Sequence, residues 1–144
     1  NPSYPTEAAV YYIGDRGTYS PAQNDHKALL FDKSKNLFVI PVMVYETNVS
    51  SNWGYGSRVW QGAYILNIDE NTIGLRGKIT HFDALSDSKY GFYDSRFQIM
   101  RSLYMDNTLY TLSDSKIKAS KLDTIEELNS ISFPTFDQES RYYY

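Results

Sequence analysis

Short runs of apolar, β-branched and aromatic residues recur along the chain, and polar turns separate them. Residues 37–46 are nearly all apolar, as expected of a strand that is covered on both faces. No segment shows a convincing periodicity of an amphipathic helix. The pattern therefore predicts an all-β chain. The expected strands span residues 26–32, 37–46, 60–69, 73–82, 97–105, 108–113, 116–123 and 125–133.

The expected strands fall into two groups of four that resemble each other. The matching stretches are residues 28–32 and 102–106, residues 64–69 and 118–123, and residues 75–82 and 128–133. An internal repeat of four short strands is typical of a β-propeller blade, which buries its faces only against neighbouring blades. The repeat predicts a β-propeller fragment with two four-stranded antiparallel blades, at residues 26–82 and 97–133, and a tail at residues 134–144 without a clear pattern.

Composition limits the classes of partner and chemistry. The 14 tyrosines and 7 phenylalanines suit the faces of β-sheets, and the net charge of −3 argues against nucleic acid or an anionic membrane as the main partner. The absence of cysteine excludes disulfides, thiolate nucleophiles and cysteine-based zinc sites, although it does not exclude secretion. No apolar run reaches the roughly 18 residues of a transmembrane segment.

The first residues also bear on the location of the protein. The start, NPSYP, has neither an initiator methionine nor the apolar centre of a signal peptide. We therefore expect the chain to be soluble as given and to begin inside a longer precursor.

Several motifs together resemble a known family. They lie at residues 13–20 (IGDRGTYS), 25–28 (DHKA), 35–42 (KNLFVIPV), 60–64 (WQGAY), 101–104 (RSLY) and 109–115 (LYTLSDS). Across nearly all of residues 1–133 the chain resembles the C-terminal part of secreted archaeal and bacterial proteins with a β-propeller domain distantly related to WD repeats. The resemblance implies an extracytoplasmic propeller, secreted or at the cell surface, with no established catalytic activity.

Two blades are too few for a propeller, which needs about four to eight. Residues 8–13 resemble the outer strand of a preceding blade, so the other three strands of that blade would be missing. Unpaired strand edges and uncovered blade faces promote association. We expect another polypeptide to supply the remaining blades, either the other half of a cleaved precursor or another subunit.

Asp25 and His26 are the most suggestive pair of neighbouring polar residues, because they resemble a general base or a metal ligand. They stand at a strand entry, where WD-repeat propellers place a histidine in a structural hydrogen-bond network. The structural role is therefore favoured. For His81, the other histidine, a packed or edge-exposed role in a strand is favoured over metal binding.

Calcium is the one metal that the sequence leaves open. Asp83, Asp87 and Asp94 lie in or beside one polar loop, and carboxylate oxygens are the ligands that calcium prefers. The spacing of a calcium-binding loop is absent, so a solvated acidic loop is the favoured interpretation. Two histidines without cysteine make a transition-metal centre improbable.

The loop at residues 47–59 is the strongest candidate for a binding surface. Asn48 begins an N-glycosylation acceptor pattern, and Trp53 and Tyr55 form an aromatic patch of the kind that contacts carbohydrate or protein. The alternative is a loop that merely packs over a neighbouring blade.

Two classes of function remain. The favoured class is a non-enzymatic module for protein interaction or structural assembly, since the sequence has no nucleophile elbow, phosphate loop or zinc-protease motif. The alternative is a propeller hydrolase or a carbohydrate-binding unit with its site in the central channel. Carboxylates on the innermost strands would favour the alternative, whereas residues such as Ala28 and Ser102 favour a packed scaffold.

Overall fold

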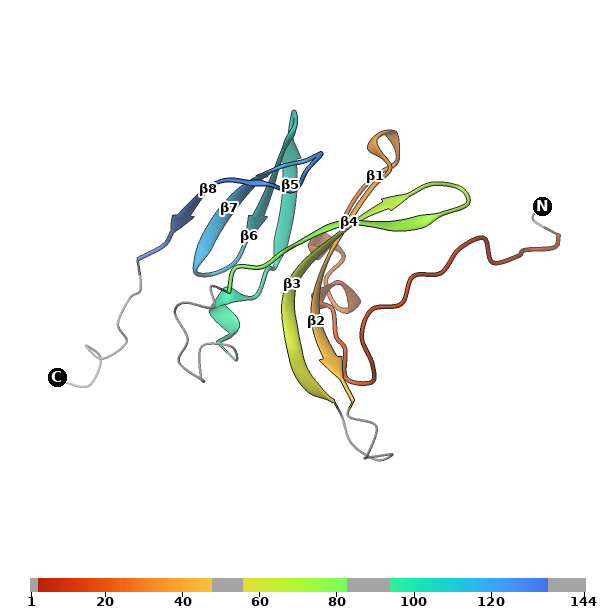
Figure 1. Cartoon of the computed structure of the whole chain (residues 1–144), viewed down its shortest axis with the longest axis horizontal. Helices are drawn as coiled ribbons and strands as arrows, with labels where there is room; N and C mark the ends of the chain where they lie inside the picture. The colour runs from red at the N-terminus through yellow and green to blue at the C-terminus, as the bar shows by residue number, and fades with distance from the viewer. Residues whose placement is uncertain (1–2, 48–55, 83–93, 135–144) are drawn as a thin grey trace.

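The computed structural model describes residues 3–47, 56–82 and 94–134, which form two four-stranded antiparallel sheets in sequential strand order (Figure 1). The first sheet contains β1 (Leu30–Asp32), β2 (Leu37–Glu46), β3 (Ser57–Ile68) and β4 (Ile73–Ile79). The second contains β5 (Arg101–Met105), β6 (Thr108–Leu112), β7 (Lys116–Lys121) and β8 (Glu127–Ser132). The prediction of an all-β chain with two four-stranded antiparallel sheets is confirmed.

Capped turns shorten two of the expected strands. Asp25 and Asp94 each accept a hydrogen bond from the backbone N–H two residues later, at 2.9 Å in both cases. These caps start 3₁₀ turns at η2 (His26–Ala28), which occupies the start of the expected strand at residues 26–32, and at η6 (Ser95–Phe97), which includes the first residue of the expected strand at residues 97–105. The ladders therefore begin only at Leu30 and Arg101.

Residues 8–13 form no strand, although the apolar pattern predicts one. A strand needs a hydrogen-bonded neighbour, and no described strand pairs with this segment. Its assignment as the outer strand of a preceding blade stays a prediction.

Pro41 lies inside β2 opposite Ala63 without a bulge; the register shift falls at Val44 and Tyr45. Met43 exchanges backbone hydrogen bonds with Tyr19, so backbone groups at alternate positions of β2 point away from β3. Pro41 shares this direction, beyond the end of β1 at Leu30, and its carbonyl accepts a 2.6 Å bond from Ser20 Oγ. The missing N–H of Pro41 therefore falls where no strand needs it.

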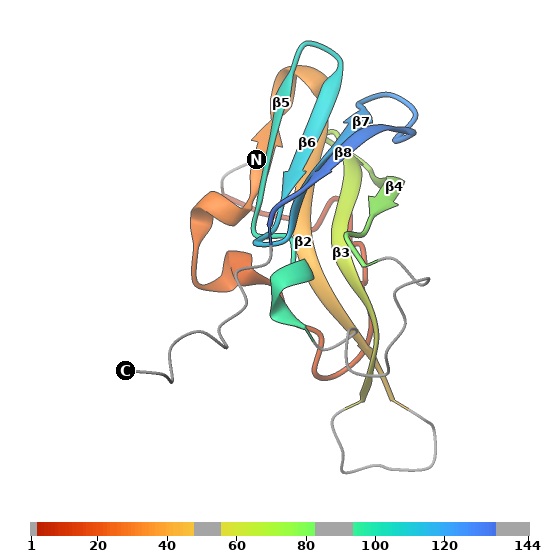
Figure 2. The ribbon, with the colours of Figure 1, turned by 90° about the vertical axis from the view of Figure 1, so that its left-hand side faces the viewer.

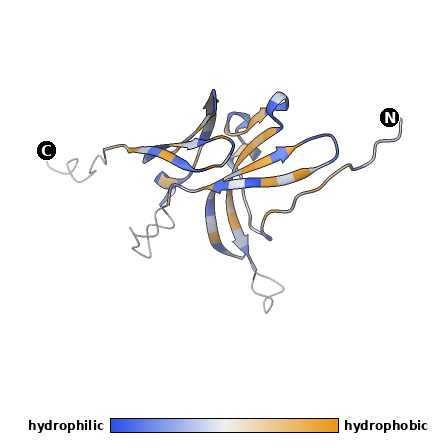
Figure 3. Ribbon diagram, turned by 45° about the horizontal axis from the view of Figure 1, so that its top comes forward, coloured by the Kyte–Doolittle hydropathy of each residue, from blue (hydrophilic) through white to orange (hydrophobic). Residues whose placement is uncertain are grey.

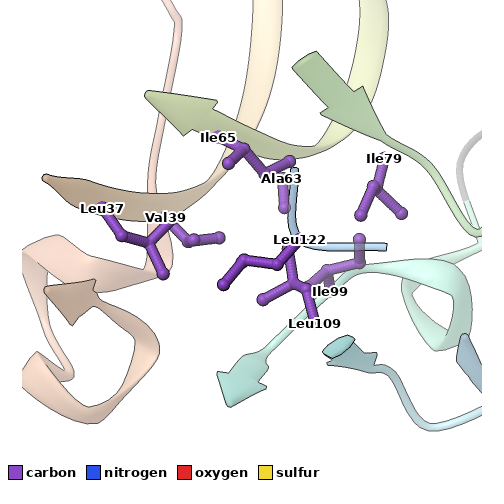
Figure 4. Packing of buried hydrophobic residues seen from close by; sticks show 8 residues of the cluster. All are labelled: Leu37, Val39, Ala63, Ile65, Ile79, Ile99, Leu109 and Leu122. Atoms are coloured by element: carbon purple, nitrogen blue, oxygen red, sulfur yellow. The ribbon is translucent and has the colours of Figure 1, made fainter. Parts of the chain in front are cut away.

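One hydrophobic core joins the two sheets (Figure 4). Figure 2 shows β5–β8 in front of β2 and β3, and Figure 3 shows hydrophobic positions along the strands of both sheets. The buried cluster consists of Leu37, Val39, Ala63, Ile65, Ile79, Ile99, Leu109 and Leu122. Neither sheet buries its residues alone, which is how neighbouring blades are stabilised.

Candidate functional site

Polar side chains surround the core between the two sheets, a region that we call the seam. One group gathers around His81, just after β4, and a second joins the first strands, β1 and β5, of the two sheets. The seam is the region of the described chain where polar groups converge, and it is therefore the candidate site.

His81 is fully buried at the seam, with 0% of its surface exposed. Its Nδ1 lies 2.8 Å from Ser113 Oγ, and its Nε2 lies 2.8 Å from Thr111 Oγ1. A neutral imidazole donates from one nitrogen and accepts at the other, and hydroxyl groups adapt to either role. With both nitrogens engaged, the imidazole ties the end of the first sheet to β6 of the second.

The hydroxyl group of Ser113 extends this cluster. It lies 3.0 Å from Ser115 Oγ and accepts a 3.2 Å bond from the backbone N–H of Lys116. Such bonds within the turn that joins β6 and β7 hold the hydroxyl group in position for the imidazole. The geometry is that of a structural clamp between sheets.

Asp25 and Arg101 link the sheets near the start of β5. Arg101 Nη2 donates to Asp25 Oδ2 at 2.5 Å, while Asp25 Oδ1 caps the η2 turn through Lys27 N–H. The bond from Lys27 and then that from Arg101 lower the pKa of Asp25 below its ordinary value. His26 is exposed, so the carboxylate of Asp25 is the member of this predicted pair that reaches the second sheet.

Asp32 and Tyr104 make a second link between β1 and β5. The Tyr104 hydroxyl group donates to Asp32 Oδ2, and the Asp32 carboxylate also caps η3 (Lys33–Lys35) through Ser34. The hydrogen bond from the Ser34 hydroxyl group, followed by that from Tyr104, lowers the pKa of Asp32 from 3.8 to about 2. The same contact with Asp32 raises the pKa of Tyr104.

These bonds predict a pH dependence. Because the pKa of Asp32 is lower in the folded chain, its ionised form stabilises the fold fully above about pH 4, and this contribution is lost as the pH falls toward about 2. Asp32→Asn is expected to make thermal stability less steeply dependent on pH in that window. Melting curves at intervals between about pH 2 and 5 would measure the difference.

Tyr104→Phe is the matched control for this experiment, since it removes the donor on β5 and leaves Ser34 in place. We expect Tyr104→Phe to give a pH dependence between those of the wild type and Asp32→Asn. If the pH dependence of Asp32→Asn equals that of the wild type, the carboxylate does not have its lowered pKa.

Most predicted binding residues lie outside the described part of the chain. These are Asn48, Trp53, Tyr55, Asp83 and Asp87. Asp94 is described, and its carboxylate caps η6 and forms an ion pair with Arg96 at 2.6 Å. Within residues 3–47, 56–82 and 94–134, no group of three or more acidic or histidine side chains could hold a metal ion. Calcium and glycosylation therefore stay predictions.

Sequence reasoning missed the partners across the seam. Arg76 is one of them, since its Nη1 donates to the carbonyl of Leu122 at 3.2 Å. Arg101, Tyr104, Thr111 and Ser113 fall inside the motifs at residues 101–104 and 109–115, which were the one signal that pointed to them. Nothing in the sequence paired them with His81 or with the carboxylates.

The family comparison agrees with this blade-like arrangement. The family model of the beta propeller domain matches residues 1–125. The chain belongs to the beta propeller domain family. No curated protein and no solved structure matches it. Among the described residues of this propeller chain, no helix is long and apolar enough to cross a membrane.

Each propeller sheet keeps one face outside the seam, and apolar residues line both faces. On the second sheet Met105 and Ile131 are 57% and 61% exposed, and a hollow of about 320 Å³ lies between Tyr110, Ile117 and Ala119. On the first sheet, Phe31 and Ile68 border a hollow of about 530 Å³ that is otherwise lined by polar residues of the turns at residues 33–36 and 69–72. Exposed apolar surface such as that of the second sheet marks interaction sites.

Proposed function

We propose that the chain is a non-enzymatic, extracytoplasmic propeller module for protein interaction or structural assembly, and that blades from another chain or from the rest of a precursor complete it. The apolar face of β5–β8 is the observation that carries this proposal. It continues a stack whose first interface is already formed, because the other face of the same sheet is buried in the seam.

The chemistry of the seam supports a scaffold. Both ring nitrogens of His81 are hydrogen-bonded to hydroxyl groups. The carboxylate oxygens of Asp25 and Asp32 accept hydrogen bonds from capped turns and from side chains of β5. Groups engaged in this way stabilise blade packing and leave little capacity for proton transfer. The inner positions Ala28, which is buried, and Ser102, which is partly buried, carry no carboxylate.

An extracytoplasmic location is part of the proposal. It rests on the resemblance of the motifs at residues 13–20 and 109–115 to those of secreted propeller proteins. The absence of cysteine means that no thiol would be exposed to an oxidising compartment.

Methionine oxidation tests whether other blades complete the chain. Met105 is 57% exposed on the free face of β5–β8, whereas Met43 and Met100 are partly buried and serve as internal controls. In material purified from the native source, we expect Met105 to react with peroxide several-fold more slowly than in the isolated, folded chain, because another blade covers it. Peptide mass spectrometry would measure the three rates.

Equal rates for Met105 in the two preparations would contradict the proposal, provided that Met43 and Met100 also react alike. In that case the native protein leaves this face uncovered, and the chain acts without further blades.

A further inference from the structure

The turn between β7 and β8 anchors the second sheet to the first. This turn, at residues 122–126, places the apolar side chains of Leu122 and Ile125 against the core of the seam. Leu122 is 3% exposed and lies within the buried cluster (Figure 4). Its carbonyl also accepts a 3.2 Å hydrogen bond from Arg76 Nη1 of β4. The turn is therefore docked on the face of the first sheet that lies in the seam.

The docked turn fits the first sheet closely at Gly77. A Cβ atom at Gly77 would lie only 2.9 Å from Cγ1 of Ile125, so the side chain of Ile125 occupies the space that the glycine leaves. Ile125 has a φ of 59°, a backbone conformation that is strained for a β-branched residue. Such a conformation persists only where surrounding contacts hold it, so the fit between Ile125 and Gly77 is specific.

The two sheets are stacked in the same orientation. Their first strands, β1 and β5, lie side by side and are joined by the hydrogen bond from Tyr104 to Asp32. In both sheets the pairing of the third and fourth strands shifts at the same place, directly after Ile65 in β3 and directly after Ala119 in β7. The free face of β5–β8 therefore corresponds to the face of β1–β4 that lies in the seam, and Ala119 is the counterpart of Ile65.

The hollow on the free face of β5–β8 occupies an equivalent place to the docked turn. Strand pairing gives the counterparts around it, which are Leu37 and Thr108, Val39 and Tyr110, Ile65 and Ala119, and Gly77 and Asn129. All four residues of the second sheet line the hollow of about 320 Å³. Their counterparts surround the docked turn, since three belong to the cluster that contains Leu122 and the fourth, Gly77, contacts Ile125. The hollow thus lies where the seam holds apolar side chains of a turn.

The differences between the two faces determine which side chain the hollow fits. Ala119 is smaller than its counterpart Ile65, which leaves room for a longer apolar side chain over Ile117. In the seam, Arg76 is the donor to a carbonyl of the turn. On the free face, Asn129 lies beside the hollow, and its side-chain oxygen accepts the next backbone N–H at 2.9 Å. The amide nitrogen of Asn129 is then the donor that faces an incoming turn.

We propose that the hollow on β5–β8 binds the turn between the last two strands of an added blade, that is, of a blade that completes the chain. The turn inserts an apolar side chain at least as large as leucine between Tyr110 and Ala119, and Asn129 donates to a carbonyl of the turn. The proposal rests on the proposed function and specifies how the added blade is held. Continuity with the seam supports it, because the same face of the first sheet already holds a turn of this kind.

A single cysteine tests whether the hollow is filled. The chain contains no cysteine, so the variant Ala119→Cys carries one thiol, and this thiol lies in the hollow. In material from the native source, we expect this thiol to react with iodoacetamide about tenfold more slowly than in the isolated, folded chain, because the docked turn excludes the reagent. Asp114→Cys, at an exposed position in the turn between β6 and β7, is the matched control and should react equally fast in both preparations.

A bulky substitution distinguishes an inserted side chain from flat coverage of the face. Ala119→Trp fills the hollow, and the core of the seam lies on the opposite face of the sheet. We expect the isolated variant to keep the melting temperature of the wild type. In native material of this variant, Met105 should react with peroxide as fast as in the isolated chain, because the added blade cannot dock. Ala119→Ser leaves the hollow open and should keep Met105 protected. If Ala119→Trp fails to fold, Ala119→Phe replaces it.

The results separate this proposal from the proposed function. If Met105 of the wild type is protected in native material but the thiol at position 119 reacts as in the isolated chain, the added blade does not enter the hollow. This proposal is then wrong, and the proposed function stands. Continued protection of Met105 in Ala119→Trp has the same meaning. If Met105 of the wild type is not protected in native material, both the proposed function and this proposal are wrong.

Discussion

Leu109→Ala is expected to lower the free energy of unfolding by about 2–5 kcal/mol, the range for aliphatic truncations at fully buried sites. Leu109 is 0% exposed and contributes to the cluster that both sheets share. The smaller side chain would leave a cavity in the seam, and the strands on either side are held by their ladders and cannot collapse into it. Urea denaturation followed by tyrosine fluorescence would measure the loss.

Leu29→Ala is the matched control, because it removes the same atoms at a 37% exposed position that ends the η2 turn. A cost below about 1 kcal/mol is expected there. Similar losses for both variants would mean that the seam is not the main source of stability.

His81→Leu is expected to lower the free energy of unfolding by about 2–4 kcal/mol. The substitution removes two buried hydrogen bonds and leaves the Thr111 hydroxyl group without the imidazole as a partner. Thr111 is itself fully buried, so water cannot replace the lost imidazole without opening the seam. Ser113 keeps Ser115 and a backbone N–H as partners, so the penalty falls mainly on Thr111. Equilibrium denaturation measures the loss.

A double-mutant cycle with Thr111→Val isolates this contact. Valine has nearly the shape of threonine and needs no partner, so the double variant should lose less than the sum of the single losses, by about 1 kcal/mol or more. Additive losses would show that the imidazole and the Thr111 hydroxyl group do not interact in the folded protein.

The hairpins were predictable because short polar turns separate the apolar runs. The turn at residues 106–107 and the stretch at residues 33–36 mark the ends of strands to within a few residues. The first residues of β1 and β5 were less predictable, because a single aspartate determines where each of these two strands begins. Asp25 and Asp94 cap 3₁₀ turns, and a carboxylate that binds its own backbone competes locally with the ladder.

The internal repeat was informative about architecture and misleading about equivalence. Aligned by residue type, residues 28–32 and 102–106 place Leu30 opposite Tyr104. The backbone pairing makes Leu30 equivalent to Leu103, because the first hairpin has a four-residue turn and the second a two-residue turn. A shift of one residue exchanges the faces of a strand, so the alignment places residues of the first strand on the wrong face.

The candidate site shows the same limit. Sequence reasoning favoured a structural network at Asp25 and His26 and a packed or edge-exposed role for His81. In the structure, Asp25 links to Arg101, His26 is exposed and His81 forms the buried clamp. The partners of His81 are 30 and 32 residues away in the chain, and no local spacing relates a histidine to hydroxyl groups at such a distance.

By itself, the sequence determined the all-β class and the eight strands in two groups of four. These properties follow from local alternation and turn chemistry, which act over a few residues. Only the tertiary structure decided which face of each sheet meets the other and that His81 joins them. Which face of a sheet packs against the other sheet depends on the direction of the backbone and on contacts between segments far apart in the chain. These are properties of the folded molecule alone.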